Sequence, residues 1–206
     1  MGGWSNSFFD GLLALAALWG AMRFYAMRQR DGMRFGAAAL AIVFLASLFG
    51  VLRYGGVTAA PIVAANDGLS LIAAIAAPTW AIAAILLAFR GGQNRARLAI
   101  LWIVPVAVAV LAFLPATAML GEVYSQIAGL AMVVMLVGAG VIAAIRNKTV
   151  AGVALAFSAA GYALAALVAL NVFDQPDATA LDIFHIGIAV WAAAFAFGLT
   201  AASHRA

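Results

Sequence analysis

Cysteine is absent from this chain, so disulfide bonds and thiolate metal ligands are both excluded. Charged residues are also scarce: they make up 9% of the 206 residues, whereas soluble globular domains carry roughly 25%. Hydrophobic residues account for 67% of the chain. A water-soluble core of this length could not hide so much apolar surface, which indicates a protein whose solvent is lipid.

Lysine and histidine are nearly absent, and this excludes three kinds of cofactor site. The only lysine is Lys148, at a predicted helix end, whereas retinal needs a lysine in the middle of a span. The two histidines, His185 and His204, are separated along a helix by roughly 28 Å. One chain cannot bring them together, so a bis-histidine haem and a three-histidine zinc site are excluded.

Seven apolar segments are long enough to cross a membrane, since a span needs about 20 apolar residues. They cover residues 5–27, 35–54, 67–89, 96–114, 116–145, 149–170 and 179–203. No long linker or second domain interrupts them. The predicted fold class is therefore all-α: a polytopic seven-transmembrane-helix bundle that forms a single domain over residues 1–206.

The sequence leaves some boundaries of the predicted spans open. Residues 55–66 contain a proline and indicate an outer loop. The fifth window is longer than a span needs, so either that helix tilts or residues 121–126 form an outer entry turn. Pro78 and Pro105 lie inside the third and fourth spans and should kink those helices.

Basic residues test the number of spans, because arginine and lysine collect in cytoplasmic loops. With seven spans, ten of the eleven basic residues fall on one side, and only Arg53 falls on the other. The ten are Arg23, Arg28, Arg30, Arg34, Arg90, Arg95, Arg97, Arg146, Lys148 and Arg205. This asymmetry predicts an outer N-terminus, a cytoplasmic C-terminus and a multi-pass protein of the inner (plasma) membrane. The net charge of +4 is then an orientation signal and not a sign of nucleic-acid binding.

Acidic residues show the opposite asymmetry, since all but Asp31 map to the outer side. Asp174 and Asp177 fall in residues 171–178, which indicate a plain polar turn. Asp10, in contrast, lies more than a turn inside the first span. Asp182 and His185 share one face of the seventh span. Ionisable groups inside a bilayer cost several kcal/mol unless they pair or face a polar cavity, so these three side chains should point inward.

A polar layer in the outer third of the bundle follows from these positions. Asp10, Asp182 and His185 are the predicted catalytic residues. The predicted binding residues end the second span or open the third and fifth: Arg53, Tyr54, Asp67 and Glu122. Purely structural roles stay open, with Arg53 pairing with Asp10 or Asp67 to lock helices together, or Asp67 acting as a helix N-cap. A serine hydrolase that uses Ser5, Ser7 or Ser125 with His185 as base also stays open.

The layout of Asp10, Ser47, Arg53, Asn66-Asp67 and Asp182-Ile-Phe-His185 resembles a known superfamily. This is the group of seven-helix membrane hydrolases and receptors that includes alkaline ceramidases, adiponectin receptors and hemolysin-III proteins. More narrowly, the chain is similar to small bacterial seven-helix proteins near that group. The resemblance implies a zinc site for amide or ester hydrolysis, to which Ser47, His185 and Asp67 would contribute. The superfamily's second-span histidine is missing, and Ala189 stands one turn after His185 where a second histidine is expected.

Two functions are compatible with these residues. The first is hydrolysis of a lipid or amide at the outer leaflet, with His185 as general base or metal ligand and Arg53 holding an anionic head group. If a divalent metal binds, its predicted ligands are His185, Asp10 and Asp67. The second is a non-enzymatic carrier, sensor or accessory membrane subunit. Membrane lipids are the expected partners, and self-association or a membrane complex is compatible with either function.

Overall fold

The computed structural model describes residues 3–30, 32–90, 95–170 and 177–203, and these residues form helices and short connections without any strand. The helices are α1 (Gly3–Ala26), α2 (Met33–Tyr54), α3 (Ala60–Arg90), α4 (Arg95–Ala112), α5 (Ala118–Ile145), α6 (Thr149–Ala169) and α7 (Asp177–Ser203). A 3₁₀ turn, η1 (Pro115–Thr117), precedes α5. Six of these helices are long and apolar enough to cross a membrane, whereas the apolar part of α4 is the shorter Leu98–Ala112. The chain is thus an all-α protein with the helices of a multi-pass membrane protein.

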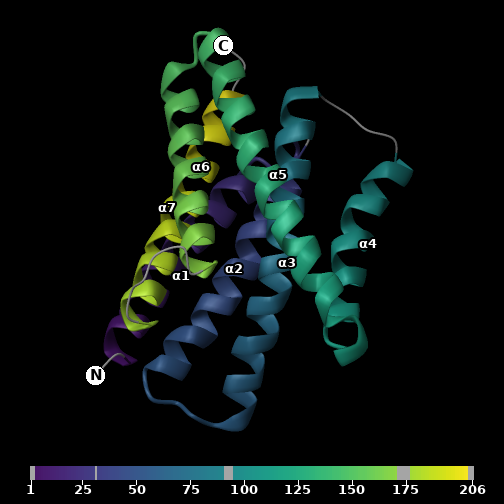
Figure 1. The fold of residues 1–206 in the computed structure, drawn as a ribbon. Helices are drawn as coiled ribbons and strands as arrows, with labels where there is room; N and C mark the ends of the chain where they lie inside the picture. Colours follow the sequence, from purple (N-terminus) through teal and green to yellow (C-terminus); the bar gives the residue numbers. More distant parts are fainter. Residues whose placement is uncertain (1–2, 31, 91–94, 171–176, 204–206) are drawn as a thin grey trace.

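Consecutive helices run in opposite directions, so the N-terminus and the C-terminus lie at opposite ends of the bundle (Figure 1). Six helices form a ring in the order α1, α2, α3, α5, α6, α7, and α7 packs against α1 to close it. Helix α4 lies outside this ring, where it contacts α3 and α5 (Figure 1).

One predicted boundary was wrong, and one of the two alternatives for the fifth span is excluded. Helix α3 begins at Ala60 and not at residue 67, so much of the expected outer loop is helical. Pro61 is tolerated there because the amide groups of a first helical turn have no partner inside the helix. Asp67 consequently lies inside α3 and is not an N-cap. Residues 121–126 are helical within α5, and the entry turn is η1 instead.

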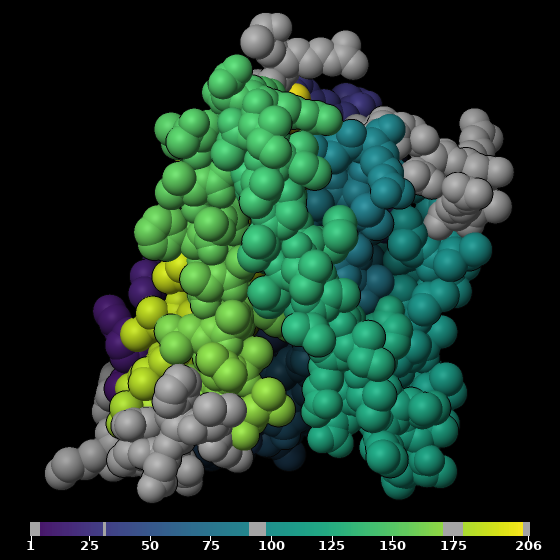
Figure 2. Space-filling view, turned by 45° about the horizontal axis from the view of Figure 1, so that its top comes forward, coloured from purple at the N-terminus to yellow at the C-terminus, as the bar shows by residue number. Residues whose placement is uncertain are grey.

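Small residues let α5, α6 and α7 approach one another closely. A Cβ atom on Gly152 would lie 2.7 Å from the carbonyl oxygen of Gly140, and one on Gly161 would lie 2.7 Å from that of Gly187. Figure 2 shows α5 and α6 side by side on one face of the bundle. Such contacts matter in lipid, where dispersion and close packing replace the hydrophobic drive between helices.

The half of the bundle that holds the C-terminus has a tightly packed apolar core. Phe24, Leu155, Trp191, Phe195 and Leu199 are all 1% exposed or less. The rings of Phe24 and Phe195 lie 5.1 Å apart, and those of Trp191 and Phe195 are stacked at 5.9 Å. These side chains fill the ring between α1, α6 and α7.

Candidate functional site

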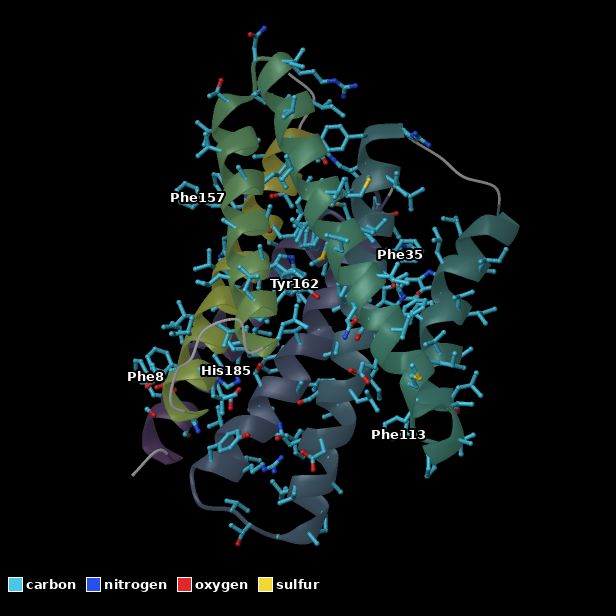
Figure 3. All side chains as sticks on the ribbon, viewed as in Figure 1. Phe8, Phe35, Phe113, Phe157, Tyr162 and His185 are labelled. Carbon is cyan, nitrogen blue, oxygen red and sulfur yellow. The ribbon has the colours of Figure 1, made fainter. Side chains whose placement is uncertain are left out.

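The first and last helices bring a buried histidine and a buried aspartate together. Nε2 of His185 on α7 lies 3.2 Å from Oδ1 of Asp10 on α1, and the two side chains are 9% and 5% exposed. Gly50 on α2 provides the space for this carboxylate, since a Cβ atom there would lie 2.7 Å from Cγ of Asp10. In Figure 3, His185 lies at the end of the bundle where the N-terminus is found.

Among the residues that the structure describes, four buried polar atoms around this pair find no hydrogen-bond partner: Asn6 Oδ1, Asp10 Oδ2, Asp182 Oδ1 and His185 Nδ1. Asn6 lies one turn before Asp10 on α1, and Asp182 lies one turn before His185 and interacts electrostatically with it. A buried acceptor without a partner costs about 1–3 kcal/mol, so four of them at one helix interface require an explanation.

The four atoms share one chemical property. Carboxylate and amide oxygens only accept hydrogen bonds, and in a neutral imidazole with its proton on Nε2 the Nδ1 atom also only accepts. Nε2 of His185 faces Asp10, which is the arrangement that places the proton on that nitrogen. The site is therefore rich in acceptors and contains two carboxyl groups, and it is suited to a molecule that donates several hydrogen bonds.

The polar site does not continue toward the other end of the bundle. Beyond His185, the buried face of α7 carries Trp191, Phe195 and Leu199. The buried hydroxyls of this region already donate hydrogen bonds to backbone carbonyl oxygens. Ser158 donates to that of Trp191 at 3.1 Å, and Thr200 donates to that of Ala196 at 2.7 Å. Among the residues that the structure describes, the site is thus polar at one end of the bundle and closed by the apolar core.

Arg53 belongs to a separate cluster at the α2–α3 turn. Its Nη1 atom forms an ion pair with Asp67 and donates a hydrogen bond to Oδ1 of Asn66 at 3.0 Å. Asn66 in turn donates to the carbonyl oxygen of Ala46 at 3.1 Å, which ties α3 to α2. The guanidinium lies 5.5 Å from the ring centroid of Tyr54. These contacts link α2 to α3, and among the described residues Arg53 pairs with Asp67 and not with Asp10.

Glu122 is not part of the buried site either. It is exposed on α5, and its carbonyl oxygen accepts a hydrogen bond of 2.8 Å from the hydroxyl of Ser125. Nearby, the hydroxyls of Tyr124 and Thr79 form a hydrogen bond of 2.9 Å that joins α5 to α3. Of the seven predicted site residues, the buried site unites Asp10, Asp182 and His185.

Neither Ser7 as a nucleophile nor the predicted set of metal ligands is supported by this geometry. The hydroxyl of Ser7 donates to the carbonyl oxygen of Val51 at 3.1 Å. Within the described ranges, no group of three or more histidine, aspartate or glutamate side chains is placed to hold a metal ion. His185 and Asp10 come together as predicted ligands would, but Asp67 is bound to Arg53. The three predicted ligands therefore do not form a metal site in this arrangement.

Asn6 and Gly50 were missed by sequence reasoning. Asn6 could have been found, because it lies four residues before Asp10 and so shares its helix face. Gly50 could not, because its role depends on how α1 packs against α2. Several predictions lie outside the described residues, namely those on Asp31, Asp174, His204 and Arg205, and the side chain of Asp177 is not described.

No model of a protein family, no curated protein and no solved structure matches this chain.

Proposed function

We propose that this chain is a seven-span inner-membrane protein whose outer polar site binds a hydrogen-bond-donating lipid head group and hydrolyses it. The N-terminus would be outside and the C-terminus in the cytoplasm. Helix α4 supports the seventh span, since its 18 residues extend about 27 Å, close to the 30 Å of a bilayer core. The positions of the basic residues support the orientation.

The observation that carries the proposed chemistry is the buried Asp10–His185 pair with its unpartnered acceptors. In this proposal Asp10 orients the imidazole through Nε2, and Nδ1 acts as the general base. Nδ1 would take a proton from a water molecule while the water oxygen attacks an ester or amide carbonyl. The imidazolium would return that proton to the leaving oxygen or nitrogen as the carbon–heteroatom bond breaks.

The same acceptors select the substrate. Asp10 and Asp182 would favour an ammonium or hydroxyl group, which could donate to their free oxygens and to Asn6. An anionic head group has no basic partner in the buried site, because Arg53 is committed to Asp67 and Asn66. The proposed substrate is therefore an amino- or hydroxyl-bearing lipid of the outer leaflet.

A second candidate is an outer-facing sensor or binding subunit that uses the same site without turnover. It is favoured by the commitment of the Ser7 hydroxyl to Val51 and by the lack of a three-donor metal group among the described residues. A carrier is less well supported, because the apolar core beyond His185 offers a polar solute no path in this conformation.

The test uses the purified full-length protein in nanodiscs that contain phosphatidylethanolamine, phosphatidylglycerol or phosphatidylcholine. Mass spectrometry would measure released fatty acid and head group for the wild type and for Asp10→Asn, His185→Gln and the control Arg53→Gln. Hydrolysis of phosphatidylethanolamine that is lost in both site variants but kept in the control supports the enzyme. Selective binding without turnover supports the sensor. Equal behaviour of the wild type and both folded site variants refutes the proposed site.

The orientation needs a separate measurement. An alkaline phosphatase reporter on the C-terminus is active only in the periplasm, so the proposed topology predicts an inactive fusion. An active fusion would refute an inner C-terminus without bearing on the chemistry of the site.

A further inference from the structure

A groove of about 550 Å³ runs along the outside of the bundle, and neither Asp10 nor His185 lines it. Its walls come from α1 and α6, and its floor comes from α7, which is visible between them at the left edge of Figure 2. Every lining residue is apolar: Trp19, Val150, Val153, Ala154, Phe157, Val190, Ala193, Ala194 and Phe197. We call this feature the α1–α6 groove.

The shape of the α1–α6 groove follows from the sizes of its side chains. Ala193 and Ala194 leave the floor low, whereas Trp19 and Phe157 form high rims that are 41% and 62% exposed. Figure 3 shows Phe157 projecting outward from α6. Along α6 the groove extends from Val150 to Phe157, roughly 10 Å at 1.5 Å per residue. Its volume is within the usual 300–1,000 Å³ range of small-molecule sites.

One end of the groove carries a positive charge with free hydrogen-bond donors. The guanidinium of Arg23 lies 5.4 Å from the ring of Trp19 and 5.2 Å from that of Phe197, two groove residues. Its Nε atom donates to the hydroxyl of Thr200 at 2.6 Å. Within the part of the chain that the structure describes, the two terminal nitrogens of Arg23 make no hydrogen bond.

Two more basic side chains bind the C-terminal end of α7, next to the same end of the groove. Nζ of Lys148 donates to the carbonyl oxygen of Ala202 at 2.6 Å, and Nη1 of Arg30 donates to that of Ser203 at 2.6 Å. The described acidic side chains of the groove helices, Asp10 and Asp182, lie toward the opposite end of the bundle. The groove thus passes from an apolar interior to a basic end, which complements a molecule with an acyl tail and an anionic head.

We propose that the α1–α6 groove binds one anionic phospholipid. Its phosphate would accept hydrogen bonds from the terminal nitrogens of Arg23, and one acyl chain would lie over Ala193 and Ala194. The planar guanidinium of arginine can donate two parallel hydrogen bonds to the oxygens of one phosphate. Basic pockets between spanning helices are typical sites for anionic head groups. A second copy of the chain, packed in parallel, would instead bring its own Arg23 to the same level, where like charges repel. Placement of this lipid in the inner leaflet rests on the proposed orientation, but the binding site does not.

The test is native mass spectrometry of the full-length protein in detergent with phosphatidylglycerol and phosphatidylcholine of identical acyl chains. The wild type should retain phosphatidylglycerol about fivefold more than phosphatidylcholine, the equivalent of about 1 kcal/mol per basic contact. Arg23→Gln should remove this preference, and Ala194→Phe should reduce retention of both lipids by filling the floor. Controls are Arg28→Gln, an exposed arginine at the same end, and Ala41→Phe, an exposed alanine on α2.

Several outcomes would overturn the proposal. These are equal retention of the two lipids by the wild type, an unchanged preference in Arg23→Gln, and equal losses in the groove variants and their controls. A dimer that Ala194→Phe dissociates would assign the groove to a second copy instead. Because Arg23 also bonds Thr200, Ala194→Phe provides a test that leaves this hydrogen bond in place.

Discussion

Gly50 offers a stringent test of the buried site, because replacing it with alanine perturbs Asp10 without changing any residue of α1 or α7. The new Cβ atom would lie 2.7 Å from Cγ and 2.9 Å from Oδ1 of Asp10, and closer still to Oδ2. The carboxylate would have to move, and its 3.2 Å contact with Nε2 of His185 would be lost or α2 would be displaced from α1.

The expected change in the free energy of unfolding follows from two opposing effects. Overpacking a closely fitted interior typically costs about 1–3 kcal/mol. Alanine recovers about 1 kcal/mol of helix propensity relative to glycine. Gly50→Ala should therefore destabilise the protein by up to about 2 kcal/mol. The matched control is Gly138→Ala on α5, where the added methyl meets no atom within 4 Å, so it should be neutral or slightly stabilising.

The assay is reversible unfolding by titration of a mild detergent with sodium dodecyl sulfate, followed by tryptophan fluorescence. The two glycine variants are compared first, and Gly50→Ala is then repeated in an Asp10→Ala background. Without the carboxylate the methyl group has room, so Gly50→Ala should cost at least about 1 kcal/mol less there. If its cost is the same in both backgrounds, within about 0.5 kcal/mol, the contact between Gly50 and Asp10 is not what limits this position.

Three further predictions concern packing and pairing. Gly152→Ala should destabilise the protein by up to about 2 kcal/mol, because its Cβ would lie 2.7 Å from the carbonyl oxygen of Gly140 while alanine recovers about 1 kcal/mol of helix propensity; detergent unfolding measures this. Removing Arg53 and Asp67 singly and together should give a coupling energy below about 1 kcal/mol that falls with added salt, because their side chains are 30% and 63% exposed. Ser158→Ala should lose about 0.5–1.5 kcal/mol, since its hydroxyl donates to the Trp191 carbonyl; a thermal melt followed by tryptophan fluorescence measures this, and an unchanged melting temperature would contradict it.

Hydropathy predicted the helices well wherever the polar residues lie at their ends. The sixth helix was expected over residues 149–170 and is Thr149–Ala169, because charged and polar residues flank a continuous apolar run. Hydropathy failed at the start of α3, where Pro61 and Asn66 suggested a loop and Asp67 was expected to be the first residue of the helix. Those polar side chains are accommodated inside a helix by Arg53 and by the carbonyl oxygen of Ala46, partners that belong to another helix and cannot be seen in the local sequence.

Helix periodicity predicted which residues of the candidate site share a helix face, but not which helices meet there. A spacing of three residues places Asp182 and His185 on one face of α7. Nothing local indicates that Asp10 rather than Asp67 lies against His185, since both had been placed at the outer end. That choice is made by the packing of α1 between α2 and α7 and by the space above Gly50.

The closure of the ring between α1 and α7 has a consequence for biosynthesis. The two residues of the buried pair come from the first and the last of the described helices, so Asp10 is synthesised well before His185. Until α7 is inserted, that carboxyl group has to be tolerated in lipid, by hydration from the nearby surface or by a chaperone. A nascent chain that stops after α6 would hold six of the seven helices yet have neither a closed ring nor a site, so quality control that senses an exposed Asp10 would recognise unfinished molecules.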